Sequence, residues 1–76
     1  MDSSASSQRS TILRYLNEHG SLTTLQCREE LGIMHPAARI RELRESGHNI
    51  VTHWAKSEDR TGTMHREAKY VSFFQP

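Results

Sequence analysis

The apolar residues change their spacing at Gly47, and this change constrains the fold more than any other feature of the chain. Before it, in the segment that contains Ile12 and Leu16, apolar side chains recur at helical intervals. After it, over residues 50–55, the side chains alternate with the period of a strand. Since the two periods specify different elements, the pattern predicts an α+β domain in which helices come first and strands follow.

Two helices are predicted in the first half of the chain. The first covers residues 8–19 and ends before Gly20, a residue type common at helix C-termini. Residues 21–23 form a link that could add a brief edge strand. A capping box formed by Thr23 and Gln26 then starts the second helix, which is expected to cover residues 24–31.

A third helix is predicted over residues 36–46, with Pro36 at its first position and Gly47 at its end. Its apolar residues recur every three positions and form the predicted buried stripe of Ala37, Ile40 and Leu43. The opposite side carries His35, Ala38, Glu42 and Glu45, and it is flanked by Arg39 and Arg41. Arg44 lies nearer the buried stripe, so we expect it to form a structural ion pair with a carboxylate of the first or second helix.

A β-hairpin is predicted after the third helix. Its strands lie within residues 48–56 and 68–74, and the polar segment 57–67, with Gly62 in its middle, is interpreted as the loop between them. A lone hairpin is marginally stable in water, so this one must pack against the helices. We expect Trp54 to pack in the core or against Tyr70.

The composition excludes several classes of protein. Ten Lys and Arg residues against nine Asp and Glu residues give a formal net charge of +1. The single cysteine, Cys27, cannot form an intramolecular disulfide and is interpreted as a small buried residue. No apolar run approaches the roughly 20 residues of a membrane span, so a cytoplasmic protein that contacts no membrane is expected. No metal-ligand spacing, no catalytic pair and no cofactor motif is present, so we expect neither an enzyme nor a cofactor.

The length allows one small domain. We expect it to cover residues 8–73, after a disordered polar lead of residues 1–7 whose last serine caps the first helix, and before a short end of residues 74–76. Leu, Ile, Val and Phe together account for only 14 of the 76 residues, so the core must be small and the stability modest.

The second helix, the glycine-containing turn and the third helix have the arrangement of a helix-turn-helix, whose second helix enters the major groove of DNA. The segment 31–50, LGIMHPAARIRELRESGHNI, also resembles the phage-type winged helix-turn-helix family. The similarity lies in Leu-Gly-Ile at the end of one helix, Arg-Ile and Leu-Arg within the next, and Gly-His-Asn-Ile leading into the wing. It covers residues 8–73 and implies three helices followed by a two-stranded wing. It further implies a small phage or prophage protein that binds DNA, commonly as a regulator of transcription in a bacterial host cell.

These arguments predict a DNA-binding surface with contributions from three segments. The third helix and its N-terminal turn contribute His35, Ala38, Arg39, Arg41 and Glu42. The wing contributes Arg60 and Arg66, since an arginine can enter the negative minor groove. The second helix contributes Thr24 and the free amides of its first turn, which can bind a phosphate.

A structural role remains the alternative for each group. Arg39 and Arg41 are spaced to pair with Glu42 and Glu45 within the helix. The wing segment also carries Glu58, Asp59 and Glu67, so it is equally consistent with a solvated loop.

The predicted partner is double-stranded DNA, and the small net charge predicts that a second protein chain takes part in binding. From His35 onward the chain carries seven Lys and Arg residues against five Asp and Glu residues, a net charge of only +2. Since phosphate neutralisation supplies most non-specific affinity, useful binding would need a second copy of the chain or a larger protein. The competing hypothesis is a winged helix that docks on a host or phage protein, which the carboxylates Glu42 and Glu45 favour.

Overall fold

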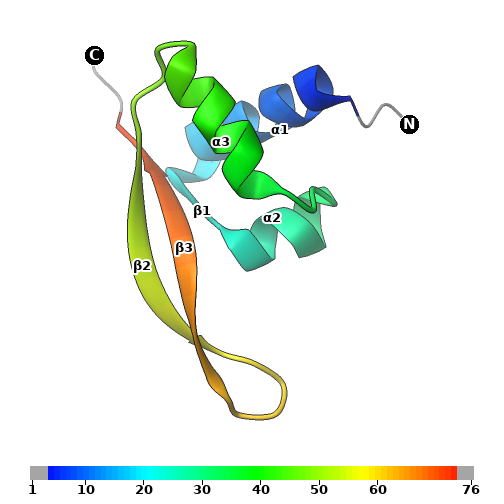
Figure 1. The fold of residues 1–76 in the computed structure, drawn as a ribbon, viewed down its shortest axis with the longest axis vertical. Coiled ribbons are helices and arrows are strands. Elements are labelled where there is room, and N and C mark those ends of the chain that lie inside the picture. Colours follow the sequence, from blue (N-terminus) through cyan, green and yellow to red (C-terminus); the bar gives the residue numbers. More distant parts are fainter. Residues whose placement is uncertain (1–3, 74–76) are drawn as a thin grey trace.

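Three helices cover one face of a small antiparallel sheet in the computed structural model, which describes residues 4–73 (Figure 1). In chain order the elements are α1 (Ala5–His19), β1 (Ser21–Thr23), α2 (Thr24–Leu31), α3 (Pro36–Glu45), β2 (Ile50–Glu58) and β3 (Met64–Ser72). The far half of the β2–β3 hairpin extends beyond the helices as a projecting arm (Figure 1). The predicted α+β winged architecture is therefore confirmed, with β1 added to the wing strands.

Helix α1 begins earlier than the sequence pattern predicts, at Ala5. Its N-cap is Ser4, whose hydroxyl accepts a hydrogen bond from the Ser7 N–H group at 3.2 Å, so the prediction that Ser7 caps the helix is wrong. The extra turn is polar and largely exposed, and hydrophobic spacing cannot reveal a turn that buries little. The remainder of the predicted disordered lead, residues 1–3, and the predicted end, residues 74–76, lie outside the described residues.

Helix α2 and strand β1 have the predicted bounds. The Thr23 hydroxyl accepts from the Gln26 N–H group at 3.0 Å, and the Gln26 side-chain carbonyl accepts from the Thr23 N–H group at 3.0 Å. This capping box satisfies two backbone donors and fixes where the helix starts. Thr23 is therefore both the N-cap of α2 and the last residue of β1, which pairs with β3.

Helix α3 ends one residue before the predicted boundary, with Ser46 as its C-cap. Gly47 has a φ of 100°, and the His48 N–H group donates to the Leu43 carbonyl at 3.0 Å, which closes the helix in a Schellman arrangement. The buried stripe is Pro36, Ile40 and Leu43, whereas Ala37 is exposed. The expectation for Ala37 is therefore wrong, because Pro36 occupies the i−4 position on the row that faces the core.

The sheet has the strand order β1-β3-β2, with both pairings antiparallel. The β2–β3 ladder continues through the pairs Lys56↔Arg66 and Glu58↔Met64, so only residues 59–63 remain as the connection. The predicted loop over residues 57–67 is thus mostly strand. Both faces of this part of the hairpin are largely exposed, so its backbone pairing leaves no apolar alternation in the sequence to detect.

The core lies between the helices and the near half of the sheet. Its members come from all six elements and the adjoining turns: Ile12, Leu16, Leu22, Cys27, Ile33, Ile40, Leu43, Ile50, Ala68 and Tyr70. The predicted burial of Cys27 is confirmed. Trp54 is 63% exposed, so the expectation that it lies in the core is wrong, while the alternative that it packs against Tyr70 stays a prediction. Trp54 pairs with Ala68, one step along the core face from the Thr52↔Tyr70 pair, where the helical layer ends.

Replacing Ile40 by alanine should destabilise the domain by roughly 2–5 kcal/mol, because the change removes buried methylene groups and leaves a cavity. Chemical denaturation monitored by circular dichroism measures the difference. Arg41→Ala, on the exposed face of the same helix, is the matched control and should change the free energy of unfolding by no more than about 0.5 kcal/mol. Equal stability of wild type and Ile40→Ala would contradict the orientation of α3.

A thiol reagent should label Cys27 slowly in the native protein and rapidly in denaturant. Burial raises the pKa of the Cys27 thiol to about 11, so the reactive thiolate is scarce at neutral pH and shielded from the reagent. The labelling rate of N-acetylcysteine under the same conditions is the reference for a free thiol. A native-state rate equal to that reference would contradict the packing of α2.

Candidate nucleic-acid interface

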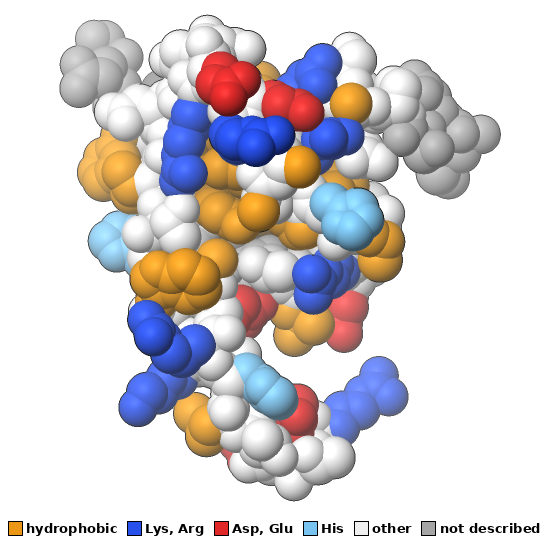
Figure 2. Space-filling view, viewed as in Figure 1, with side chains coloured by type: hydrophobic (Ala, Val, Ile, Leu, Met, Phe, Trp, Pro, Cys, Tyr) orange, Lys and Arg blue, Asp and Glu red, His pale blue; other side chains and the backbone are white. Residues whose placement is uncertain are grey.

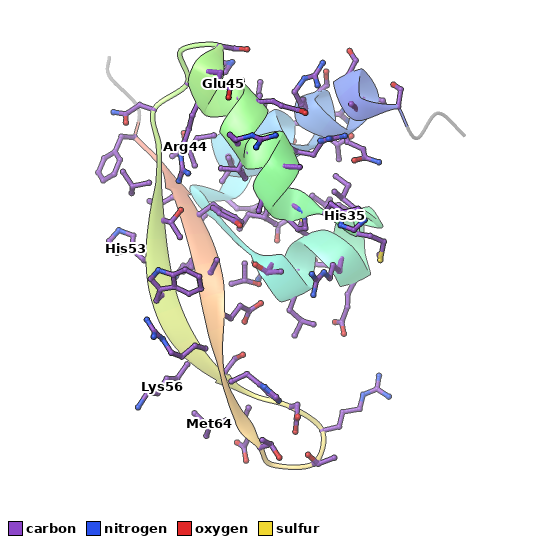
Figure 3. All side chains as sticks on the ribbon, in the orientation of Figure 1. His35, Arg44, Glu45, His53, Lys56 and Met64 are labelled. Atoms are coloured by element: carbon purple, nitrogen blue, oxygen red, sulfur yellow. The ribbon has the colours of Figure 1, made fainter. Side chains whose placement is uncertain are left out.

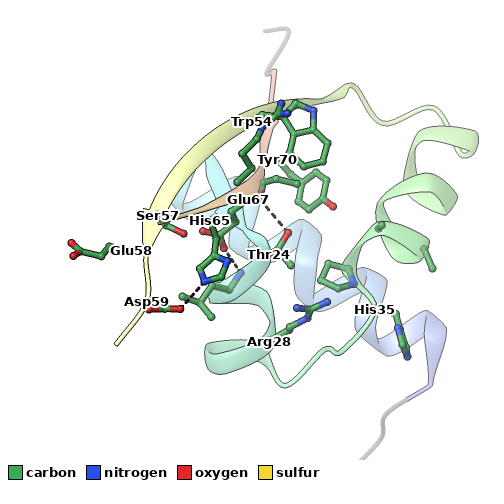
Figure 4. Close-up of a pocket in the computed structure, with 16 residues that line it drawn as sticks. Thr24, Arg28, His35, Trp54, Ser57, Glu58, Asp59, His65, Glu67 and Tyr70 are labelled. Carbon is green, nitrogen blue, oxygen red and sulfur yellow. Dashed lines mark hydrogen bonds and ion pairs between the residues drawn. The ribbon is translucent and has the colours of Figure 1, made fainter. Parts of the chain in front are cut away.

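A groove of about 720 Å³ lies between the helix-turn-helix and the hairpin. The starts of α2 and α3 form one wall, and the hairpin strands form the other (Figure 4). Representative lining residues are Thr24, Arg28, Ala37, Trp54, Arg66 and Tyr70. Figure 2 shows the hollow between the helical body and the tip of the hairpin, with Lys and Arg side chains on both parts. Any ligand that fills this groove touches the helix-turn-helix and the wing together.

The groove collects only some of the predicted site residues. Four of them line it: Thr24, His35, Ala38 and Arg66. Arg39, Arg41 and Glu42 lie further along α3, and Arg60 lies in the connection at the hairpin tip. His35, labelled in Figure 3, stands at the start of α3 and makes no side-chain capping bond to that helix.

Arg39 and Glu42 are occupied within the protein. The Arg39 guanidinium lies 3.1 Å from a Glu42 carboxylate oxygen, and Arg9 of α1 donates to the same carboxylate at 2.9 Å. All three side chains are largely shielded, so this cluster joins α1 to α3. The structural alternative for Arg39 therefore describes its geometry, and Glu42 presents a neutralised carboxylate.

Unlike Arg39, Arg41 is exposed and only loosely paired. Its side chain is 72% exposed, and its only ion pair among the described residues is a 3.9 Å contact with the equally exposed Glu45. A pair at this distance in water contributes little to stability. The Arg41 guanidinium is therefore available to a ligand that approaches the outer face of α3.

Arg44 has a structural role, as predicted, but with different partners. It donates to the Ile50 carbonyl at 2.7 Å and to the Thr52 hydroxyl at 2.6 Å, so it joins α3 to β2 (Figure 3). The expected ion pair with a carboxylate of α1 or α2 is therefore wrong. The geometry follows from the hairpin, since β2 passes directly beside the last turn of α3.

The N-terminus of α2 is satisfied by β3. The Glu67 carboxylate accepts a hydrogen bond from the Leu25 N–H group, and the Thr24 hydroxyl donates to the Ala68 carbonyl at 3.2 Å. Two of the groups considered for phosphate binding are therefore engaged within the protein. A negative side chain at a helix N-terminus is also favourable for the helix dipole.

The hairpin wall carries an exposed pair that the sequence analysis missed. The Arg66 guanidinium carbon lies 5.4 Å from the centroid of the Trp54 ring, within the range of a cation–π contact. The sequence placed Trp54 in the core or against Tyr70, and neither expectation indicates its exposed position on the groove wall. Arg28, on the opposite wall of the groove, donates to the Met34 carbonyl at 3.2 Å. Its position in α2 does not indicate from the sequence that it lines the groove.

The tip of the hairpin is organised by Asp59. Its carboxylate accepts from the Thr61 N–H group at 2.9 Å, the Thr61 hydroxyl at 2.6 Å and the Thr63 N–H group at 3.0 Å, and it lies 2.6 Å from His65 Nε2. Gly62, with a φ of 83°, donates to the Asp59 carbonyl and completes the turn. These hydrogen bonds hold the pKa of Asp59 well below its ordinary range. The backbone that carries Arg60 is therefore closely held.

Comparison with known proteins identifies the family. Residues 7–72 match the model of the family described as winged helix-turn-helix domain, so the chain belongs to this family. Comparisons with curated proteins and with solved structures found no match. Membership suggests DNA binding, the typical non-enzymatic role of such domains. In the part of the chain that the structure describes, no helix is long and apolar enough to cross a membrane.

Asp59→Ala should loosen the hairpin tip without unfolding the domain. The Thr61 and Thr63 amides lose their acceptor, so they should exchange hydrogen faster while the amides of α1 and α3 keep their protection. Nuclear magnetic resonance measures both sets at once. Glu58→Ala removes a neighbouring carboxylate and should leave the tip amides unchanged.

In the wild type, the same amide signals should respond to pH in one direction. Because folding lowers the pKa of Asp59, the tip order is present above the ordinary aspartate pKa of about 3.9 and is lost only as pH falls through the lower, folded value. Loss of the protection of these amides from exchange centred above pH 4, as distinct from a shift of their signals caused by the neighbouring His65 ring, would contradict the assigned role of Asp59.

Proposed function

We propose that the chain binds double-stranded DNA sequence-specifically, as a small phage or prophage regulator of transcription. Helix α3 would enter the major groove, and the tip of the hairpin would reach an adjacent minor groove. The protein would act in the cytoplasm of a bacterial host cell. The phage origin and regulatory role rest on the resemblance of residues 31–50 to the phage-type family.

The observation that carries the proposal is the presence of an arginine on each wall of one groove. The hairpin wall also carries Glu58, Asp59 and Glu67, of which Asp59 and Glu67 accept hydrogen bonds within the protein. Arg28 projects from α2 and Arg66 from β3, and both line the space between the helix-turn-helix and the wing. A sugar–phosphate strand that separates the major from the minor groove fits between them. In this arrangement Arg28 and Arg66 contact phosphates, and the exposed Trp54 ring packs against a deoxyribose.

The remaining site residues divide by position. Arg41, one turn into α3, is the side chain free to meet a base edge or a phosphate. Arg60 is carried by the ordered tip and is proposed for the minor groove. Thr24, Arg39 and Glu42 would contribute by holding α2 and α3 in place, whereas His35 and Ala38 would face the DNA directly.

The small net charge of the region sets a second requirement. A net charge of +2 from residue 35 onward supports only weak phosphate binding by one molecule. We therefore propose that two copies of the chain bind adjacent half-sites on the DNA, or that one copy binds DNA together with a larger protein. Sedimentation of the protein with a selected duplex measures the stoichiometry.

Selection of duplexes from a random pool, followed by titration at two salt concentrations, tests the function. Arg66→Ala should weaken binding on all sequences and reduce the salt slope by about one, because this side chain is proposed to contact a phosphate. Arg41→Ala should cost roughly 1–3 kcal/mol and relax preference at one position if it reads a base. The matched control is Arg14→Ala, which removes an exposed arginine from α1, away from the groove. Failure to enrich any duplex would overturn the proposal.

A specific observation also favours the alternative of a protein-docking module. The groove has apolar lining residues such as Leu25, Pro36 and Trp54, and Leu25 and Trp54 are exposed. Glu45→Gln distinguishes the two functions, because this carboxylate is exposed and paired only loosely with Arg41. For a DNA-binding protein the change removes repulsion from phosphates and should tighten non-specific binding. For a docking module the change should weaken binding of the protein partner, and the affinity for DNA should stay negligible. Glu42→Gln gives a less clear answer, since it also opens the cluster with Arg9.

A further inference from the structure

The outer face of the first turns of α3 is made of methyl groups. Ala37 is exposed and Ala38 half-buried, while Pro36 and Ile40 face the core. Of the longer polar side chains near these methyl groups, Arg39 pairs with Glu42, whereas His35 at the N-cap lines the groove. The next free polar group on the same face is Arg41, four residues after Ala37.

The groove places these methyl groups toward the wing. Ala37 and Ala38 line the same space as Trp54 and Arg66, and Figure 4 shows the start of α3 facing the hairpin across it. A duplex that contacts α3 and the hairpin together must therefore pass along the first turn of α3. The base edges opposite Ala37 and Ala38 meet methyl groups, and the neighbouring side chain able to hydrogen-bond is His35, at the N-cap of the helix.

The chemistry of the base edges then limits what this turn can select. A methyl group neither donates nor accepts a hydrogen bond, and the one apolar group on the major-groove edges is the thymine C5-methyl. Opposite guanine or cytosine, polar base atoms would lose water without gaining a partner, which is unfavourable. Methyl–methyl contact with thymine avoids that loss and removes apolar surface from water.

We propose, on the basis of the DNA-binding function above, that α3 selects its site through thymine. Ala37 and Ala38 contact thymine C5-methyl groups, and Arg41 contacts a base or phosphate nearby. Four residues of helix rise about 6 Å, so the thymine contact and the Arg41 contact lie within about two base-pair steps of one another. The site is therefore defined by thymine at the start of α3 rather than by a row of guanine contacts.

Replacement of thymine by deoxyuridine tests this inference, because it removes only the C5-methyl group. In a duplex enriched by selection, each replacement opposite α3 should weaken wild-type binding about fourfold, the factor expected from the transfer free energy of one CH₂ group. Replacements outside the α3 footprint should have no effect. The Arg14→Ala variant should retain the full sensitivity to deoxyuridine.

Two variants complete the cycle. Ala37→Gly removes the protein methyl, so deoxyuridine replacement should no longer matter for the base opposite residue 37. Ala38→Gly should remove the sensitivity at the neighbouring base, and melting curves establish that each variant is folded. If glycine unfolds the helix start, Ala37→Val keeps an apolar side chain there and should retain the preference for thymine over deoxyuridine.

The outcomes separate this inference from the function on which it rests. Equal affinity for the thymine and deoxyuridine duplexes, with the selected duplex still preferred over random DNA, would overturn the thymine contacts and leave DNA binding intact. Selected sites without thymine in the α3 footprint would have the same meaning. The absence of any preferred duplex would overturn both.

Discussion

The contacts of β3 with both neighbouring strands, the core and α2 fix the arrangement of the hairpin and the helices. This strand lies between β1 and β2, and it places Ala68 and Tyr70 in the core. In the same stretch, Glu67 accepts from the first turn of α2, and the Ala68 carbonyl accepts from Thr24. One short segment of β3 therefore connects the hairpin to the helix-turn-helix through backbone, core and capping contacts. These contacts fix the separation between the α2 side of the groove and the hairpin.

The arginines are divided between support and surface. Arg9 and Arg39 surround Glu42 between α1 and α3, and Arg44 ties the last turn of α3 to β2. These contacts hold α3 from both sides, so its orientation does not depend on the small core alone. Arg41, Arg60 and Arg66 remain outside this framework. A surface charge that contributes little to folding is available for binding a ligand. The division between the two groups of arginines therefore identifies the candidate binding surface more clearly than the net charge does.

The sequence predicted the order of elements well because local signals dominate there. The capping box of Thr23 and the turn at Gly47 act within a few residues, so α2 and the end of α3 follow from the chain itself. The errors have two causes. Several neighbouring serines could cap α1, and no apolar spacing shows that Ser4 is the one used. Elsewhere the partners are distant, and nothing near Met64 indicates that β3 continues into the wing. The orientation of Trp54 and the partners of Arg44 depend on where β2 passes the helices, which no local pattern specifies.

The candidate site was predictable only in part for the same reason. Spacing on a helix correctly placed Arg41 outside and Ile40 inside. It could not distinguish Arg39 from Arg41, because each has a glutamate at helical spacing and only the folded structure shows which pair is close and shielded. The groove itself joins residues separated by more than forty positions, such as Thr24 and Ala68. Its walls combine two arginines and three carboxylates with methyl and aromatic surface. A ligand held there would be recognised more by shape and apolar contact than by charge, and the proposed selective binding of DNA, given the small net charge, makes the same demand.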